Sequence, residues 1–216
     1  MNLRKRVPGI QKSAEQTLFT EIYEKKCWGG ADSVSGAGSD YDQTEVIREF
    51  LPHLVKELGC NSILDLPCGD FFWMNLIDMD IDYVGGDIVP RIIRTNQRKY
   101  GNARRNFIDL DIIRDILPRA DLILCRDCLV HFSDCHVFNS LKNIIVSEST
   151  FLLTTTFTKR QRNEDIPTGA WRPINLLLPP FNFPPPMKLI DERCPTGGYS
   201  DKHLGLWRIG DILISE

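Results

Sequence analysis

The sequence predicts a single α/β domain: a mostly parallel sheet with helices on both faces, ending in an antiparallel pair of strands. Two observations predict this fold. Short apolar runs alternate with amphipathic stretches over residues 62–157, which is typical of parallel strands joined by crossover helices. Two further apolar runs, at residues 187–194 and 204–212, follow each other without a helical pattern between them, as in an antiparallel pair.

Composition agrees with one domain, residues 1–216, and argues against several classes of protein. The chain is 42% hydrophobic, which is enough for a packed core. Its formal net charge of -3 lacks the basic excess expected of a nucleic-acid-binding protein. No apolar run approaches the roughly 18 residues of a membrane span, so we expect neither a nucleic-acid partner nor membrane insertion.

Cysteine usage predicts the compartment. The seven cysteines are an odd number and most lie within apolar runs, which favours reduced thiols in a cytoplasmic protein over a disulfide framework. The N-terminal segment 1–16 is basic, but no apolar stretch follows it, so it does not predict a secretory signal. We expect a frayed tail or a short arm there.

The N-terminal part of the chain predicts two helices around a glycine-rich stretch. The first helix is expected over residues 13–25, where apolar residues recur with a period of 3.6. Residues 27–40 are rich in glycine and serine, and a second helix follows at 45–59. Pro52 lies inside the second pattern and predicts a kink or a break, whereas Gly59 predicts its end.

The central part of the chain alternates between the two kinds of element. Strands are predicted at residues 62–70, 81–89, 105–112, within 120–132 and at 150–157. Helices are predicted at residues 71–77, 90–101 and 134–148. The prolines within residues 158–186 exclude a regular helix there, and we interpret this stretch as an insertion.

Acidic residues follow the predicted parallel strands, at the sheet edge where α/β proteins bind ligands. Asp65 ends the first strand, and Asp87 ends the second strand 22 residues later. In nucleotide-binding folds an acid at about this spacing accepts hydrogen bonds from ribose hydroxyls. The glycine pattern differs from that of dinucleotide-binding proteins, because Pro67 and Gly69 stand where several glycines are expected. A buried strand followed by a tight turn is the alternative interpretation.

Four motifs in order resemble those of Rossmann-like, class I S-adenosylmethionine-dependent methyltransferases. They are ILDLPCGD, YVGGDIV, FIDLDI and DLILCRDCLVHF. The first motif also resembles a bacterial subfamily with D-x-P-C-G-D, and the similarity extends from the Trp28 loop to the WRP and PPFN segments. The resemblance implies a seven-stranded sheet and S-adenosylmethionine as the cofactor.

The resemblance also implies which residues hold the methyl donor. Asp65, Pro67 and Gly69 are expected to line its methionine part. Asp87 is expected to accept the ribose hydroxyls, and Ile88 to pack on the adenine face.

Further donor contacts are expected from the next two strand ends. Asp111, or less favourably Asp109, is expected to meet the adenine amino group. Arg126 and Asp127 end the fourth strand and are expected beside the donor.

Residues 1–45 are interpreted as an N-terminal helix followed by a flap. In the subfamily that the chain resembles, the glycine-rich stretch is expected to cover the donor with Trp28, Ser35, Gly36 and Ser39. Glycines let backbone N–H groups approach a carboxylate, and serines add hydroxyl donors. A flexible linker is the alternative.

His131 is the first candidate for a catalytic base, because it follows the fourth strand on the ligand side. The alternative is a structural histidine that caps the next helix. Asp127 is the second candidate, unless it orients the donor. His203 precedes the last strand and is either a third candidate or an ordinary loop histidine.

A zinc site is conceivable at Cys125, Cys128, His131, Cys135 and His136, which have short spacings. However, alternate residues of a strand face opposite sides, and these residues also straddle a helix start. We therefore expect no metal.

Residues 158–186 are expected to form the acceptor side of the site. This segment contains basic and aromatic residues: Lys159, Arg160, Arg162, Arg172, Trp171, Phe181 and Phe183. Such a mixture suits a sugar with anionic substituents or a small polar metabolite. The alternatives are a solvated arm or a contact within a homodimer.

The leading hypothesis is methyl transfer to a small molecule or glycan, at a hydroxyl oxygen. A protein or peptide methyltransferase is the first alternative, although no peptide-binding domain is recognisable. A non-catalytic module that binds the adenosyl nucleoside is the second. Methylation of nucleic acid is disfavoured, since LPPF at residues 178–181 lies after the fifth strand and not at the end of the fourth.

Overall fold

The computed structural model describes residues 13–194 and 199–214 as one seven-stranded mixed sheet with helices on both faces. The strands are β1 (Ser62–Asp65), β2 (Asp82–Asp87), β3 (Arg105–Asp109), β4 (Leu122–Cys125), β5 (Phe151–Phe157), β6 (Lys188–Asp191) and β7 (Lys202–Arg208). The helices are α1 (Ala14–Glu24), α2 (Glu45–Leu58), α3 (Pro90–Tyr100) and α4 (Asp134–Val146). Of the segment 1–16, where a tail or arm is expected, residues 1–12 lie outside the described residues.

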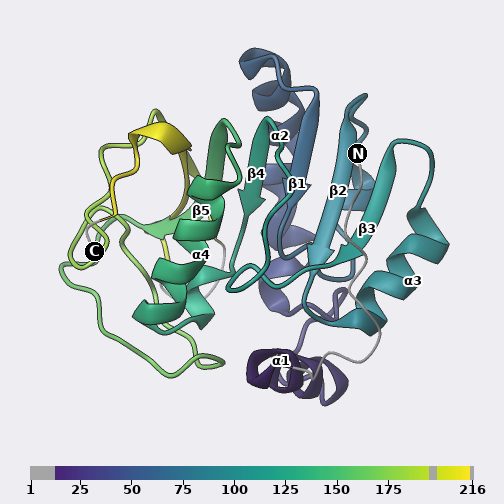
Figure 1. Cartoon of the computed structure of the whole chain (residues 1–216), viewed down its shortest axis with the longest axis horizontal. Helices are drawn as coiled ribbons and strands as arrows, with labels where there is room; N and C mark the ends of the chain where they lie inside the picture. The colour runs from purple at the N-terminus through teal and green to yellow at the C-terminus, as the bar shows by residue number, and fades with distance from the viewer. Residues whose placement is uncertain (1–12, 195–198, 215–216) are drawn as a thin grey trace.

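The order of strands in the sheet is β3-β2-β1-β4-β5-β7-β6. β1 to β5 are parallel, and β7 runs antiparallel between β5 and β6. The predicted fold class, including the antiparallel pair, is confirmed. The order reverses between β1 and β4, and a crevice for ligands lies at such a reversal, beyond the carboxyl ends of the strands. Figure 1 shows α1 at the edge toward which the arrow of β2 points.

The two faces of the sheet carry separate apolar clusters. α2 buries Leu51 and Leu54 against one face, where Ile63 and Leu124 point from the strands. α4 packs on the opposite face, as Figure 1 also shows, where its Val137 belongs to the second cluster. Burial on both sides explains why the central strands are almost continuously apolar.

The helix ends follow from the sequence. The Ser13 side chain accepts a hydrogen bond from the Gln16 amide at the start of α1. At the start of α4, the Ser133 side chain accepts one from the His136 amide. α2 ends at Gly59, whose φ of 65° is left-handed. Pro52 lies inside α2 without splitting it.

The helix predicted at residues 71–77 is wrong. Only a short 3-10 turn, Met74–Leu76, forms there. Phe71 has a φ of 62° and packs edge-on against Tyr83 and Phe107. The apolar residues of this segment therefore fill the core from an irregular turn. The last strand also ends earlier than expected, because a 3-10 turn begins at Ile209.

Residues 158–186 contain no helix or strand, as predicted, but they are not a solvated arm. Phe181 packs against Phe138 of α4, and Phe183 packs edge-on against Trp207. The expectation that Phe181 and Phe183 line an acceptor pocket is therefore wrong, since both are core residues. None of the helices in residues 13–194 and 199–214 is long and apolar enough to cross a membrane.

Candidate functional site

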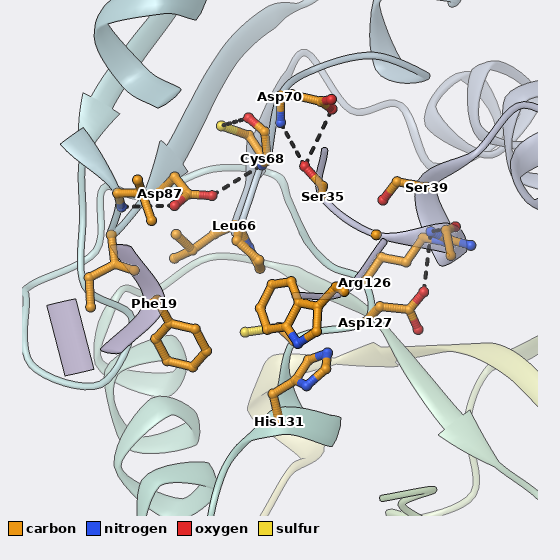
Figure 2. Close-up of a pocket in the computed structure, with 18 of the residues that line it drawn as sticks. Phe19, Ser35, Ser39, Leu66, Cys68, Asp70, Asp87, Arg126, Asp127 and His131 are labelled. Carbon is orange, nitrogen blue, oxygen red and sulfur yellow. Dashed lines mark hydrogen bonds and ion pairs between the residues drawn. The ribbon is translucent and has the colours of Figure 1, made fainter. Parts of the chain in front are cut away.

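A cavity of about 410 Å³ lies at the carboxyl ends of β1, β2 and β4. The structure brings every predicted cofactor and catalytic residue to its lining: Trp28, Ser35, Gly36, Ser39, Asp65, Pro67, Gly69, Asp87, Ile88, Asp111, Arg126, Asp127 and His131. Figure 2 shows Asp87 on one side of the cavity, with Asp127 and His131 on the other. We call these the β2 side and the β4 side.

Asp87, at the end of β2, is buried with its carboxylate held by two backbone donors. The Val89 amide donates to Oδ1 at 2.9 Å and the Gly69 amide donates to Oδ2 at 3.2 Å. Burial raises the pKa of Asp87 to about 6, although these N–H groups oppose the rise. The carboxylate is thus fixed in orientation and ionised at neutral pH.

Asp65, at the end of β1, accepts a hydrogen bond of 2.6 Å from the Tyr83 hydroxyl. Burial raises the pKa of Asp65 to about 7, and the charge of Asp87 adds to the rise. Tyr83 was missed in the sequence, because nothing in its own strand shows that its hydroxyl meets the end of β1.

Asp111 follows β3 and has one carboxylate oxygen to spare. The Ile113 amide donates to Oδ1 at 3.0 Å, whereas Oδ2 is buried without a hydrogen bond and lies 3.7 Å from Arg114 Nε. Burial raises the pKa of Asp111 above its ordinary value. Asp109, the less favoured alternative, is exposed and does not line the cavity.

Two acids that were missed in the sequence fix the glycine-rich stretch. Asp40 accepts backbone hydrogen bonds from Ala31, Asp32 and Ser33. Burial opposes ionisation, but these three N–H groups lower the pKa of Asp40 below its ordinary value. The stretch is therefore internally bonded, which favours the predicted flap over a flexible linker.

Asp70 ties this flap to the loop after β1. Its carboxylate accepts hydrogen bonds from the Ser33 hydroxyl and the Val34 amide, both at 2.9 Å. Its own amide donates to Ser35 Oγ at 2.9 Å. The Ser35 hydroxyl is thus engaged with Asp70, whereas Ser39 makes no side-chain hydrogen bond among the residues described.

Two glycines allow close contacts, one between the flap and the loop after β1 and one within the flap. A Cβ at Gly69 would lie 2.3 Å from Ser35 Oγ, and its φ of 52° is left-handed. Gly36, with a φ of 107°, would place a Cβ 3.1 Å from the Cβ of Trp28. A larger residue at Gly69 would push the flap away from the strand ends, whereas one at Gly36 would crowd Trp28 within the flap.

The β4 side holds a buried network of four charges. Arg126 Nε donates to Glu192 at 2.6 Å, and Lys202 Nζ lies 2.6 Å from Asp127 and 3.3 Å from Glu192. Arg126 also donates to the Gly38 carbonyl at 2.8 Å, so it anchors the flap. Glu192 and Lys202 were missed, because they lie in the C-terminal strand pair, far from β4 in the sequence.

This network determines the ionisation of Asp127. Burial disfavours the charged carboxylate, but Lys202 and then Arg126 lower the pKa of Asp127 to about 2. A carboxylate held in this way is a weak base.

His131 lies in a 3-10 turn after β4 with its ring held on both sides. Nδ1 lies 2.9 Å from the Ala170 carbonyl, which can only accept, so Nδ1 carries the proton of the neutral ring. Trp28 stacks on the imidazole with ring centroids 4.5 Å apart and planes inclined by 27°. Nε2 has no hydrogen-bond partner among the described residues. Burial lowers the pKa of His131, so the ring is neutral at pH 7.

The other sequence candidates lie elsewhere. His203 does not line the cavity, and its Nδ1 lies 2.9 Å from the Asp201 carbonyl. Within residues 13–194 and 199–214, no group of three His, Cys, Asp or Glu side chains is arranged to hold a metal ion.

The predicted acceptor segment, residues 158–186, contributes fewer side chains to the cavity lining than its composition suggested. Trp171 lines the cavity and is 42% exposed. Arg172 points away, where it donates to the Phe132 carbonyl and to Asp134. Arg160 is paired with Asp201 at 2.8 Å. These two arginines thus brace the segment against the domain, whereas Arg162 pairs with Glu164 within it.

Comparison with known proteins identifies the fold. No family model and no curated protein matches the sequence. The structure is similar to 1,6-didemethyltoxoflavin-N1-methyltransferase of Burkholderia thailandensis (TM-score 0.65, 16% identity), with 94% of this chain and 92% of that chain covered. It is also similar to the N-methyltransferase NodS of Bradyrhizobium japonicum (TM-score 0.63, 14% identity), with 88% and 97% covered.

A third similar structure is human N-acetylserotonin methyltransferase, with a TM-score of 0.61 and 16% identity. The alignment covers 93% of this chain, which spans 60% of the length of the human protein. The chain therefore has the class I fold of S-adenosylmethionine-dependent methyltransferases.

Proposed function

We propose that the protein is an S-adenosylmethionine-dependent methyltransferase that acts on a hydroxyl oxygen of a small molecule or glycan. The observation that carries the proposal is that one cavity has two chemically different sides. Buried carboxylates of β1, β2 and the loop after β3 line it together with a neutral histidine after β4. The fold and the complexes of two similar proteins with S-adenosylhomocysteine support this choice.

The β2 side fits the adenosyl part of the donor. The fixed carboxylate of Asp87 can accept both ribose hydroxyls. Oδ2 of Asp111, which is buried without a hydrogen bond, suits a donor such as the adenine amino group. Ile88 lines the same part of the cavity and supplies an apolar surface for the purine.

Asp65, Pro67 and Gly69 are assigned to the methionine part of the donor. The carboxylate of Asp65 suits an ammonium group, and Gly69 lets the backbone come close. S-adenosylmethionine, when bound, supplies a methyl group that its sulfonium already activates. The protein then has to orient the acceptor and remove a proton from it.

His131 is assigned as the base. With Nδ1 donating to the Ala170 carbonyl, Nε2 presents its lone pair and can take the proton of an acceptor hydroxyl. The negative charge of Asp127 favours the imidazolium that results. Asp127 itself is assigned to this electrostatic role, since its pKa of about 2 makes it a poor base.

The cellular setting is part of the same proposal. No disulfide forms among the described residues, and four of the seven cysteines are buried, as suits a reducing compartment such as the cytoplasm. The D-x-P-C-G-D string at residues 65–70 supports membership of the bacterial subfamily that the chain resembles.

Calorimetric titration with S-adenosylmethionine tests the proposal. We expect saturable binding that S-adenosylhomocysteine displaces. Transfer of a labelled methyl group to an added acceptor then separates an enzyme from a module that only binds the nucleoside. The proposal would be contradicted if neither S-adenosylmethionine nor S-adenosylhomocysteine bound.

A further inference from the structure

Three aromatic rings line the cavity on the β4 side. Phe157 ends β5, Trp171 belongs to the segment after it, and Tyr199 precedes β7. The ring of Phe157 lies 6.0 Å from Trp171 and 5.9 Å from Tyr199, and the other two rings are 5.0 Å apart. We call Phe157, Trp171 and Tyr199 the aromatic trio.

The aromatic trio adjoins the proposed base and the charge network. Trp171 directly follows Ala170, whose carbonyl accepts the hydrogen bond of His131. Phe157 lies opposite Lys202 in the β5–β7 pair, and Lys202 contacts Asp127. A molecule that touches the aromatic trio is therefore placed beside the proton acceptor.

Two partly exposed tryptophans line this cavity. Trp28 is 37% exposed and Trp171 is 42% exposed, while both line the cavity. Water against an indole ring is unfavourable, and a planar apolar ligand would replace it with ring contacts. These two tryptophans thus favour an aromatic ligand.

The charged groups on this side are already paired. Lys202 and Arg126 face Asp127 and Glu192, two cations against two carboxylates, and Arg160 is bonded to Asp201. A glycan brings many hydroxyls, and each would lose water without gaining a charged partner here. A hydroxy-aromatic compound brings one hydroxyl, for which Nε2 of His131 is available.

We infer that the acceptor is a planar aromatic compound with a hydroxyl group, held by the aromatic trio and Trp28, and not a glycan. This inference rests on the proposed function for the reaction, but the binding of the ring does not depend on the donor. It narrows the acceptor class to molecules whose one polar group faces His131.

The probe is 2-naphthol, titrated calorimetrically with and without S-adenosylhomocysteine, and methyl β-D-glucopyranoside is the comparison. We expect 2-naphthol to bind with a dissociation constant below about 1 mM, the usual range for enzyme substrates, and the glucoside not to bind. No saturable binding of 2-naphthol, or equal binding of the glucoside, would overturn the inference.

Variants locate the binding. Trp171→Leu and Tyr199→Leu are each expected to weaken the binding of 2-naphthol by about tenfold. Trp171→Phe keeps an aromatic ring and should therefore keep most of the affinity. Tyr41→Leu is the matched control, because Tyr41 is half-exposed and does not line the cavity. Wild-type affinity in Trp171→Leu would overturn the inference, with circular dichroism showing that the variant is folded.

The two proposals fail separately. Binding of 2-naphthol without binding of S-adenosylhomocysteine would contradict the methyltransferase and keep the aromatic site. Binding of S-adenosylhomocysteine without binding of 2-naphthol would contradict the aromatic site and keep the methyltransferase.

Discussion

The carboxylates on the two sides of the cavity titrate in opposite directions. On the β2 side, burial raises the pKa of Asp65 to about 7 and that of Asp87 to about 6. On the β4 side, burial alone would raise the pKa of Asp127. Lys202 and Arg126 outweigh burial and hold this pKa at about 2. The same residue type thus serves two tasks: the β2 side keeps acceptors for a ligand, whereas the β4 side fixes charge around a base.

Removing the base is expected to have the largest effect on the β4 side. His131→Ala should lower methyl transfer to 2-naphthol by about 10²–10⁴-fold, because Nε2 no longer takes the hydroxyl proton. The affinity for S-adenosylhomocysteine should stay close to that of the wild type. His203→Ala is the control, since His203 does not line the cavity. Unchanged turnover in His131→Ala would assign His131 a structural role.

Breaking the charge network comes next. Lys202→Met removes one of the two cations that Asp127 and Glu192 share, leaving only Arg126, and should lower the free energy of unfolding by about 3 kcal/mol in urea titrations at pH 7. Lys188→Met, which removes an exposed pair with Glu57, should cost under about 1 kcal/mol. Equal losses of unfolding free energy in the two variants would mean that the buried network stabilises the fold no more than an exposed ion pair does.

The same variant gives a pH signature. Because the pKa of Asp127 is lowered from 3.8 to about 2, its contribution to stability is present above pH 3.8 and is lost as the pH falls toward 2. In Lys202→Met this acid-sensitive contribution should shrink. Parallel stability–pH curves for the wild type and the variant would contradict the assignment.

On the β2 side, Asp87→Ala should weaken the binding of S-adenosylhomocysteine by about 1–3 kcal/mol, the scale for leaving polar groups unpaired. Asp82→Ala is the control, since Asp82 begins the same strand at the opposite edge and is exposed. Calorimetry that finds equal affinities in these two variants would remove Asp87 from the ribose site.

The smallest effect is expected for Asp65→Asn, with the sign opposite to that of Lys202→Met. The native pKa of about 7 lies above the ordinary 3.8, so the stability of the wild type falls as the pH rises through that window. The amide still accepts from Tyr83 but carries no charge. The variant should therefore be harder to unfold than the wild type at pH 8, with a smaller difference at pH 5. A variant less stable at pH 8 would contradict this account.

The sequence predicted the β2 side better than the β4 side, for a physical reason. Asp65, Asp87 and Asp111 each follow an apolar run, and the carboxyl ends of parallel strands meet at one edge. Local pattern was therefore enough to place them in one cavity. The same holds for His131, which follows β4 within a few residues.

The partners on the β4 side could not be found in this way. Lys202 and Glu192 meet Asp127 and Arg126 only because β7 pairs antiparallel with β5, and no local pattern gives that register. Phe181 was assigned to a pocket on composition alone, although its ring packs against α4. Aromatic residues in an irregular segment fit a core and a binding site equally well, and only packing distinguishes them.

A crystal structure of the complex with S-adenosylhomocysteine tests the central claim most directly. We predict both ribose hydroxyls within about 2.5–3.0 Å of the Asp87 carboxylate, and the adenine amino group at hydrogen-bond distance from Oδ2 of Asp111. The sulfur should face the side of the cavity that holds His131. An adenosyl group bound away from Asp87, or a purine directed at the aromatic trio, would contradict the division of the cavity.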